Sequence, residues 1–416
     1  MQIEIDERRG ASGRLPDKKM RLYIINSGWG SGGPDTVASE LYYVAEKSGH
    51  TVRYASARGN VPDSINHYQI GNQADVYLHA LSARLFDNMG KMSRRATSGL
   101  IQDIESYKPD VISIQDPLGY TMNIPMLFDY IRRSGRQTYW TLHDCWAFTG
   151  HCIAGLCDRL DKGCGDCPRK REYPKSIGID NSKGNYLLKK KVFSGISNLF
   201  LITPSKWLSG LVGKSFLKDY SVKVIPNGID LTVFKPTESD LRRKYGLEKK
   251  QIVLGVAGVW SETKGMYHFY ELADRLDDKY QCVMIGRNQD TSAANVIHID
   301  RTSDRKELCG WYTAADVFVN PTLADNFPTV NLEALACGTP VITFATGGSP
   351  ESVGKCGLVV GQGDGEGLVR AVYDIGKMGI TSAQCQEQAK AYDKWQRYAE
   401  YLEFFSGNCM GKNGEE

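Results

Sequence analysis

The sequence lacks an apolar run that could cross a membrane, since no stretch approaches the roughly 18 apolar residues that a spanning helix needs. It also lacks an excess of charge: 51 Lys and Arg stand against 48 Asp and Glu, and a net charge of +3 argues against a nucleic-acid binder. Residues 1–19 are polar and lack the apolar segment of a secretory signal. We therefore expect a disordered leader and a protein of the cytoplasm.

The remaining composition, 41% apolar and 24% charged, is typical of a globular protein, and 416 residues suggest two or three domains. Two series of alternating strand and helix patterns predict parallel βαβ units. The fold class is therefore α/β, with two doubly wound, Rossmann-like domains that face a cleft. We expect domains at 20–235 and 236–384, joined near the turn-rich segment 225–236, and a last helical segment at 385–416.

Apolar runs locate the strands of both series. The expected strands cover 21–27, 51–56, 110–115, 137–142 and 198–203, then 251–257, 281–285, 296–299, 316–320, 340–344 and 357–360, with helices near 35–48, 267–276 and 382–405. Ligands of such sheets bind beyond the carboxyl ends of the strands, so we expect the binding residues in the loops there.

The segment from Asn320 to Thr343 carries more chemical signals than any other. A buried strand runs into a polar loop, then into a short helix that Gly338 ends. The carboxylates of Asp325 and Glu333 lie eight positions apart. Free amides at the start of that helix, near 328–330, favour a phosphate group. The pattern predicts a nucleotide-sugar site; the alternative is an ordinary strand–turn–helix.

Three further loops follow expected strands. The glycines at 28–33 permit close approach to a ligand, although a tight turn is the other interpretation, and a dinucleotide site is disfavoured because the next strand ends without an acidic residue. Lys264, after the strand at 251–257, is placed to neutralise a leaving diphosphate, or else is a surface lysine. The glycines at 346–351 offer amides to phosphate or sugar, or form a structural turn.

His143 ends the strand at 137–142 and faces the same cleft, where it is a candidate to bind a sugar hydroxyl or a satisfied core histidine. Close behind it lies a cluster of cysteines in an insertion at about 145–183. The spacing of four of them suits a structural zinc site, and free thiols or a disulfide are the alternative. The four candidate zinc ligands are Cys152, Cys157, Cys164 and Cys167.

The basic run at 189–191 lies among apolar residues in a short predicted helix. One interpretation is peripheral contact with an anionic inner membrane, where lipid-linked acceptors reside, and the other is a solvated helix face.

The 320–343 segment resembles the donor-binding signature of family 4 (group 1) retaining glycosyltransferases, an E-x7-E pattern followed by E-A-x-A-C-G-T-P-V. Two departures are plain: Asp325 replaces the first Glu, and Val259 stands where the family has Arg in G-R-x-x-x-x-K-G. Arg287 and Arg301 are candidates to replace that cation. The region from 143 to 168 resembles a subgroup from bacterial polysaccharide pathways.

The resemblance implies a GT-B fold, with the last helix returning to the first domain, and assigns roles to single residues. His143, Lys264 and Asp325 become the catalytic candidates, with Asp325 on a donor-sugar hydroxyl and Glu333 on the ribose hydroxyls. The expected donor-binding residues are Gly32, Gly33, Trp260, Arg301, Asn326, Phe327, Pro328, Thr329, Glu333, Gly347 and Gly348.

The function expected from the resemblance is sugar transfer, with retention at the anomeric carbon, from a nucleotide-diphosphate donor to a glycan or polyprenol-linked acceptor in bacterial surface polysaccharide synthesis. No D-x-D motif occurs in a cleft loop, in keeping with a family that needs no catalytic metal. A nucleotide-sugar sensor without catalysis and a nucleotide-sugar epimerase of the same fold are the alternatives.

Overall fold

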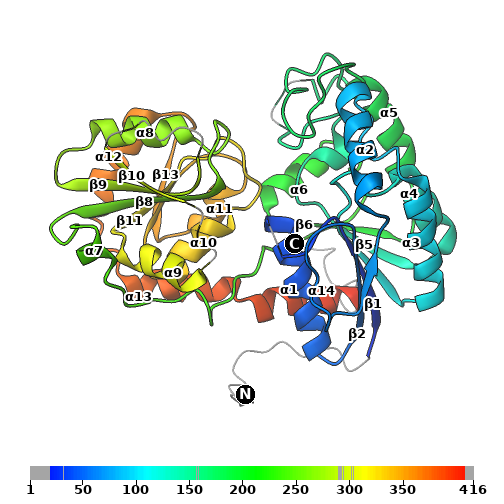
Figure 1. Cartoon of the computed structure of the whole chain (residues 1–416), viewed down its shortest axis with the longest axis horizontal. Helices are drawn as coiled ribbons and strands as arrows, with labels where there is room; N and C mark the ends of the chain where they lie inside the picture. The colour runs from blue at the N-terminus through cyan, green and yellow to red at the C-terminus, as the bar shows by residue number, and fades with distance from the viewer. Residues whose placement is uncertain are drawn as a thin grey trace, which may run out of the picture.

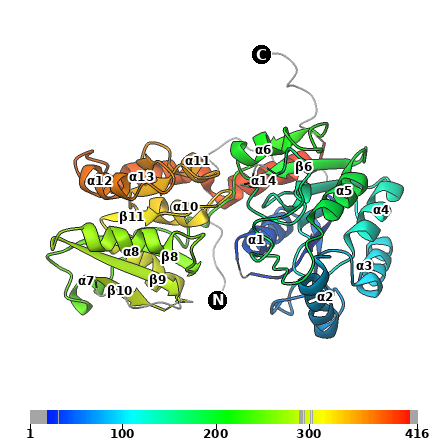
Figure 2. The ribbon, with the colours of Figure 1, turned by 90° about the horizontal axis from the view of Figure 1, so that it is seen from above.

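A computed structural model describes residues 19–30, 32–155, 157, 159–288, 293, 295–300, 302 and 304–407. The expected leader therefore lies, apart from Lys19, outside the described residues, as does Arg301. Two lobes stand side by side, each built on one parallel sheet with helices on both faces (Figures 1 and 2). The predicted α/β architecture of two doubly wound domains is confirmed.

The first lobe contains a seven-stranded parallel sheet in the order β3-β2-β1-β4-β5-β6-β7. Its elements are β1 (Arg21–Asn26), α1 (Gly33–Lys47), β2 (Thr51–Ser56), β3 (His67–Gln69), α2 (Gln73–Phe86), α3 (Arg94–Tyr107), β4 (Val111–Asp116), α4 (Ile124–Ser134), β5 (Gln137–Thr141), the 3-10 helix η1 (Trp146–Phe148), α5 (Ser182–Phe193), β6 (Leu199–Thr203), α6 (Lys206–Val212) and β7 (Val222–Val224).

The second lobe contains a six-stranded parallel sheet in the order β10-β9-β8-β11-β12-β13. Its elements are α7 (Leu241–Lys244), β8 (Gln251–Val259), α8 (Met266–Arg275), β9 (Tyr280–Arg287), β10 (Val296–Ile299), α9 (Arg305–Ala314), β11 (Val317–Asn320), α10 (Thr329–Ala336), β12 (Val341–Phe344), α11 (Ser349–Val353), β13 (Gly357–Val360), α12 (Gly365–Ile375), α13 (Ser382–Ala389), the 3-10 helix η2 (Lys390–Tyr392) and α14 (Lys394–Phe405).

The central strands are apolar throughout because helices cover both faces of each sheet. Five of the six residues of β1 are buried, and so are all four of β11 and of β12. The strand order reverses between β1 and β4 in one sheet and between β8 and β11 in the other. Loops part at such a switch point and leave a crevice beyond the strand ends. The loops that carry the predicted site residues follow these strands.

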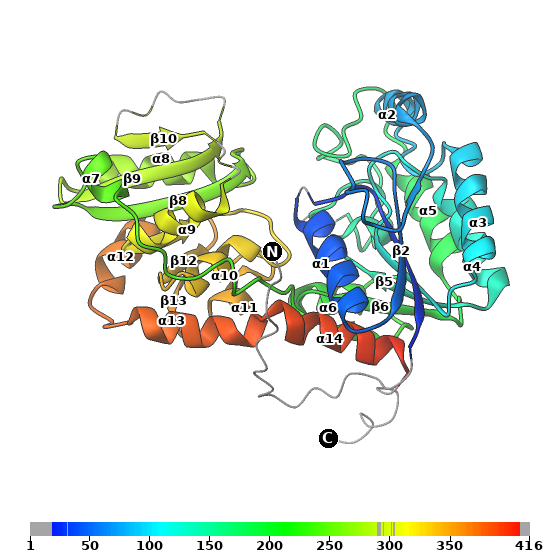
Figure 3. The same ribbon diagram turned by 60° about the horizontal axis from the view of Figure 1, so that its bottom comes forward.

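The end of the described chain ties the lobes together. Helix α14 runs from the second lobe to pack beside α1 of the first (Figures 1 and 3). Lys394, at its start, forms 2.7 Å ion pairs with Glu40 of α1 and with Asp230 of the inter-lobe linker. The linker also pairs with this segment through a parallel bridge between Ile229 and Asp393. The lobes are therefore joined by two segments of the chain, the linker and the segment that leads into α14.

Three differences from the sequence prediction have local causes. Strands β3 and β7 were not predicted, because each has only three residues and forms an edge of the sheet. The expected single helix at 382–405 is two helices, because Asp393 accepts a hydrogen bond from the Trp395 amide and starts a new helix. Among the residues that the structure describes, no helix is both long and apolar enough to span a bilayer.

Candidate active site

A cleft of about 620 Å³ lies between the lobes, at the carboxyl ends of both sheets. The first lobe contributes the start of α1 (Gly33), His143 and Asp144 in the loop after β5, and part of the Cys-rich insertion. The second contributes the loops after β8, β11 and β12. The three predicted catalytic residues, His143, Lys264 and Asp325, line this cleft. Most of the predicted donor-binding residues line it too: Gly33, Trp260, Asn326, Phe327, Pro328, Thr329 and Gly347.

Lys264 and Asp325 contact each other on the wall of the cleft that the second lobe forms. The Lys264 ammonium lies 2.8 Å from Asp325 Oδ2, and the lysine side chain remains 41% exposed. Asp325 Oδ1 also accepts a hydrogen bond from the Phe327 amide at 3.2 Å. The two catalytic candidates therefore form one ion pair, which holds the lysine in place while leaving it accessible to an anion.

The start of α10 lies beside this pair. The helix begins after Pro328, and no side chain caps it. The first amides of a helix lack partners within it and carry the positive end of the helix dipole. Since Pro328, Thr329 and Val330 all line the cleft, this end is oriented toward the space where a phosphate group would bind.

The glycines after β12 allow their loop to pack directly on the loop that contains Asp325. A Cβ on Gly347, which has φ +57°, would lie 1.8 Å from the Asp325 carbonyl oxygen. A Cβ on Gly348 would lie 2.0 Å from the carbonyl oxygen of Asn326. Gly347 lines the cleft, whereas Gly348 does not. The amide of Gly348 donates a hydrogen bond to the Asp325 carbonyl oxygen at 3.1 Å.

His143 is tied to both lobes. Its Nε2 lies 3.1 Å from Gln115 Oε1 at the end of β4, and its carbonyl oxygen accepts a hydrogen bond from Asn326 Nδ2 at 2.5 Å. Burial lowers the pKa of the imidazole to about 4. At neutral pH the ring is therefore uncharged, which suits hydrogen bonding to a hydroxyl group better than pairing with a phosphate.

Glu333 lies on the core side of α10. Its carboxylate accepts a 2.8 Å hydrogen bond from the hydroxyl of Tyr312, and it is not among the residues that line the described cleft. Burial raises the pKa of Glu333 to about 7.

An arginine lies beside Val259, where the resembled family has its cation. Val259 lines the cleft and is 58% exposed. Arg287 is its register partner on the adjacent strand β9 and is exposed. The structure thus places one of the two candidate arginines directly beside the departure; the other, Arg301, is outside the described residues.

The first lobe presents its glycine loop to the same cleft. Gly32 has φ +107°, a conformation that favours glycine, and starts α1 with Gly33. No atom lies within 4 Å of a Cβ built on either glycine, so both positions are open. Gly33 lines the cleft, whereas Gly32, also a predicted donor-binding residue, does not.

Several cleft residues were not predicted. Asp144 follows His143 in the sequence, and burial together with the nearby Asp116 raises its pKa to about 7. Glu172 and Tyr173 come from the insertion, and Asn227 from the linker. The proximity of Asp144 to His143 in the sequence was a usable signal, whereas no sequence pattern marked the other three.

Glu351 joins the lobes instead of binding a ligand. Its two carboxylate oxygens accept hydrogen bonds from the amides of Lys206 and Trp207, at 2.9 and 2.8 Å, at the start of α6. The second lobe therefore caps a helix of the first, beside the cleft that Trp207 lines.

The zinc site is not supported. Among the described residues, no three His, Cys, Asp or Glu side chains converge as metal ligands. The thiols of Cys152 and Cys167 hydrogen-bond each other, which lowers the pKa of Cys152, whereas Cys164 Sγ accepts a hydrogen bond from the Gly150 amide. The sequence spacing was compatible with four ligands, but the four sulfurs do not converge on one point: two pair with each other and that of Cys164 accepts from a backbone amide.

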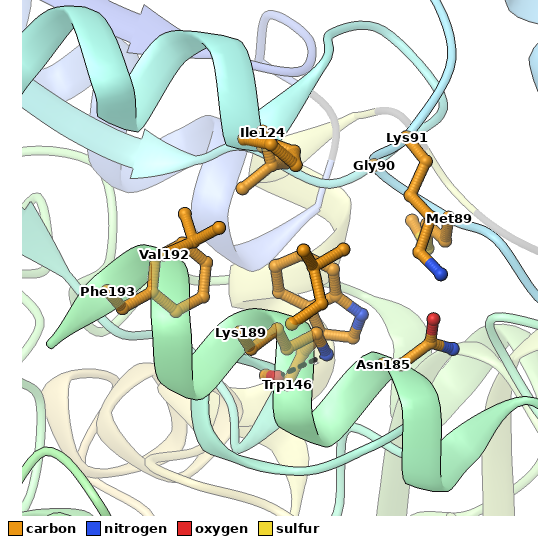
Figure 4. A pocket seen from close by; sticks show the side chains of 11 residues that line it. Met89, Gly90, Lys91, Ile124, Trp146, Asn185, Lys189, Val192 and Phe193 are labelled. Atoms are coloured by element: carbon orange, nitrogen blue, oxygen red, sulfur yellow. Dashed lines mark hydrogen bonds between the residues drawn. The ribbon is translucent and has the colours of Figure 1, made fainter.

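The basic run at 189–191 is not a uniform surface feature. Lys189 is buried and donates to the carbonyl oxygens of Trp146 and Thr149, at 2.7 and 3.0 Å, in a small pocket between α5, α4 and η1 (Figure 4). Burial lowers the pKa of Lys189 to about 7. Phe193 is also fully buried. Helix α5 therefore turns Lys189 and Phe193 inward and leaves Lys190 and Lys191 exposed, so the expected solvated basic face holds two of the three lysines.

Comparisons with known proteins agree with this geometry. Residues 250–377 match the family described as Glycosyl transferases group 1. The chain is 24% identical to the Escherichia coli (strain K12) protein that carries the name colanic acid biosynthesis glycosyl transferase WcaC, covering 93% of this chain and 99% of that protein.

Two solved structures show the same fold. HepE of Anabaena in complex with UDP has a TM-score of 0.67 at 15% identity, covering 94% of this chain and all of the other. Sucrose-phosphate synthase of Thermosynechococcus elongatus has a TM-score of 0.66 at 17% identity, covering 94% and 99%. Residues 250–377 therefore match the group 1 glycosyltransferases, and the two lobes have the GT-B fold, as the 320–343 segment predicted.

Proposed function

We propose that the protein transfers a sugar from a nucleotide-diphosphate donor to a glycan or lipid-linked acceptor, with retention at the anomeric carbon, in the synthesis of a bacterial surface polysaccharide. The observation that carries the proposal is the meeting of Lys264, the start of α10 and His143 in one cleft between the lobes. Positive groups on one wall and neutral hydrogen-bonding groups on the other suit a charged donor and a hydroxyl-rich acceptor.

The donor diphosphate lies against the second lobe in this proposal. Lys264 and the first amides of α10 stabilise the charge that develops on the departing phosphate. Binding of the diphosphate weakens the Lys264–Asp325 ion pair, so Asp325 becomes available to accept a hydrogen bond from a donor-sugar hydroxyl. Arg287, beside Val259, supplies the second positive charge. Glu333 holds the ribose hydroxyls, which requires its carboxylate to turn from the Tyr312 hydroxyl toward the cleft.

The acceptor approaches from the first lobe. Its hydroxyl oxygen forms a bond to the anomeric carbon on the face from which the diphosphate oxygen departs, and the hydroxyl proton passes to that phosphate oxygen. Neutral His143 orients the sugar or the acceptor through hydrogen bonds. Gly32 and Gly33 approach the phosphates with their backbone when the lobes close and exclude water.

Names of relatives support the choice of substrates. WcaC is named for colanic acid biosynthesis, and HepE was solved with UDP and with UDP-glucose. We therefore propose a nucleotide-sugar donor and place uridine first among the bases to test. No metal ion takes part in this scheme, because protein groups supply the positive charge at the diphosphate.

The test is a thermal-shift screen against UDP-, GDP- and ADP-sugars, followed by a transfer assay with the donor that binds. Lys264→Ala should lower transfer about a hundredfold, as expected for loss of one charge-stabilising group. Lys377→Ala removes an equally short but remote ion pair, with Asp374 at 2.7 Å, and should leave transfer unchanged. Undiminished transfer by Lys264→Ala would contradict the central electrostatic step.

The same assays separate the alternatives. Donor binding without hydrolysis or transfer across a panel of acceptors would indicate a sensor, and an isomerised donor would indicate an epimerase. Transfer should survive treatment with EDTA; activity that is lost and then restored by Mg²⁺ or Mn²⁺ would contradict the metal-free scheme. Product stereochemistry, read from the anomeric NMR signal, tests retention.

A further inference from the structure

The charged side chains that line the cleft differ between the two lobes. The second lobe supplies Lys264 and Asp325, which pair with each other. The first lobe supplies Asp144 and Glu172, and no lysine or arginine of its described residues lines the cleft. His143 adds no positive charge at neutral pH, because burial lowers its pKa to about 4. The first-lobe wall of the cleft is therefore acidic, although the whole chain carries a net charge of +3.

Asp144 is held in one orientation, with one carboxylate oxygen left for a ligand. Its Oδ1 accepts a hydrogen bond from the Trp146 amide at 2.8 Å, and no hydrogen bond from the described residues reaches Oδ2. Lys189 anchors the loop behind it. The lysine donates to the carbonyl oxygens of Trp146 and Thr149, and its ammonium lies 3.5 Å from the centroid of the Trp146 ring (Figure 4). Because Asp144 lines the cleft, its second oxygen is available to a bound molecule.

The surroundings of Asp144 disfavour negative charge. Burial and the nearby Asp116 raise the pKa of Asp144 to about 7, and burial also raises the pKa of Asp116. The attraction of Lys189 opposes this shift only in part, since its ammonium is hydrogen-bonded to two backbone carbonyls. Where one carboxylate is already costly, a second one brought by a ligand is rejected, whereas a hydroxyl or amino group can bind.

The Cys-rich insertion supplies the rest of this wall. Its cleft residues are Ile153, Ala154, Glu172 and Tyr173. Ile153 and Tyr173 give the wall apolar and aromatic surface of the kind that lines small-molecule sites, and the Tyr173 side chain is 44% exposed. Glu172 forms a 3.5 Å ion pair with Arg169, so its charge is partly balanced, whereas Asp144 has no ion pair among the described residues. Asp144 should therefore dominate the selection of a ligand by charge.

We propose that this first-lobe wall is the acceptor subsite and that Asp144 and Glu172 select an acceptor whose extended sugar bears no carboxylate. Asp144 accepts a hydrogen bond from an acceptor hydroxyl or pairs with an amino group, and it disfavours a uronic acid. The hydroxyl proton still passes to the departing phosphate oxygen, so Asp144 positions the acceptor and takes no proton. The inference rests on the proposed sugar transfer and names the class of acceptor that it uses.

Matched pairs of glycosides test this selection. The p-nitrophenyl β-glucoside is compared with the β-glucuronide, and the β-galactoside with the β-galacturonide, so that the members of each pair differ in one carboxylate. Saturation-transfer NMR with the UDP-saturated protein measures binding without turnover. Transfer is measured with the nucleotide sugar that binds in the thermal-shift screen. The neutral glycoside should bind, and its kcat/KM should exceed that of the uronide about a hundredfold.

Asp144→Asn keeps the shape of the side chain and removes its charge. The preference for the neutral glycoside should fall from about a hundredfold to about tenfold, and the change should appear in the KM for the acceptor and not in the KM for the donor. Glu172→Gln should lower the preference by less, since Arg169 already balances part of its charge. Asp166→Asn is the matched control. It removes the same charge from the same insertion, at a side chain that is 95% exposed and does not line the cleft, and should leave the preference unchanged.

Failure of this inference differs from failure of the proposed function. If no nucleotide sugar binds and no glycoside accepts a sugar, the proposed transfer itself is wrong. Selection by the first-lobe wall is overturned if donors bind but no neutral glycoside does, or if the uronides are used as well as their neutral partners. It is also overturned if Asp144→Asn keeps the full preference, or if Asp166→Asn lowers it as much. Unfolding midpoints show that all variants fold.

Discussion

The two walls of the cleft are built in different ways. The donor wall of the second lobe consists of tight loops, in which a Cβ on Gly347 would meet a carbonyl oxygen at 1.8 Å and no other residue type fits. The acceptor wall of the first lobe includes an insertion of some forty residues, placed by single contacts such as that between His151 and Asp87 at 2.6 Å. The donor wall is thus defined by local backbone geometry and the acceptor wall by long-range side-chain contacts.

This difference explains which wall a sequence reveals. A loop that tolerates only glycine at set positions leaves a pattern of residue types at fixed spacing. The few buried polar contacts that hold the insertion cannot be read from its own residues, because the partners are far away in the chain. The two walls should therefore lose different amounts of stability when their glycines or their buried polar residues are substituted.

The largest expected effect is on the donor wall. Gly347→Ala should lower the free energy of unfolding of the second lobe by more than about 3 kcal/mol, because the added methyl group collides with the Asp325 carbonyl at a left-handed φ. Gly363→Ala is the control: its φ of +75° is also left-handed, but no atom lies within 4 Å. It should cost only about 1 to 2 kcal/mol. Equal losses in urea unfolding would show that packing at Gly347 is not tight.

On the acceptor wall a buried carboxylate should matter most. Asp87 accepts hydrogen bonds from His151 Nδ1 and from the Asn181 amide at 3.0 Å, and so ties both ends of the insertion to α2. Asp87→Asn should destabilise this region by about 2 kcal/mol and expose the insertion to limited proteolysis. Asp166 lies in the same insertion, but its side chain is 95% exposed. Asp166→Asn should therefore change neither the stability of this region nor its rate of proteolysis. A proteolysis rate unaffected by Asp87→Asn would mean that other contacts hold the insertion.

The smallest expected effect depends on pH. The folded-state pKa of Glu333 is raised to about 7 from 4.5 by burial, so its contribution to stability is fully present below about pH 4.5 and is lost as pH rises through 7. The side chain of Glu333→Gln does not ionise, so this variant does not lose that stability as pH rises. Relative to the unmodified protein, the variant should gain about 2 kcal/mol of stability between about pH 5 and pH 8. Urea unfolding at both pH values measures it.

The control for this prediction is Glu366→Gln, at a side chain that is 74% exposed. Its stability relative to the unmodified protein should not change with pH. If the free energies of unfolding of Glu333→Gln and the unmodified protein differ by the same amount at both pH values, the Glu333 carboxylate is solvated in the folded state.

Much of the fold was predictable, because strands in a parallel sheet are continuous apolar runs. The strands at 51–56, 296–299 and 357–360 have the expected bounds, and most others differ by one or two residues. The short edge strand β3 escaped prediction because three residues carry no periodicity. The donor loop from Asn320 to Thr343 was predictable for the same local reason, since turn residues and helix ends are encoded where they occur.

Tertiary structure decided the rest. That Arg287 lies beside Val259, that Lys189 turns inward toward Trp146, and that the Cys-rich insertion carries Ile177 onto α2 all depend on segments brought together from distant parts of the chain. The sequence by itself determined two parallel α/β lobes and a donor loop, because apolar periodicity and glycine-dependent turns act over a few residues. Which charged groups face the cleft, and which surface remains apolar and exposed, only the packing of those lobes decided.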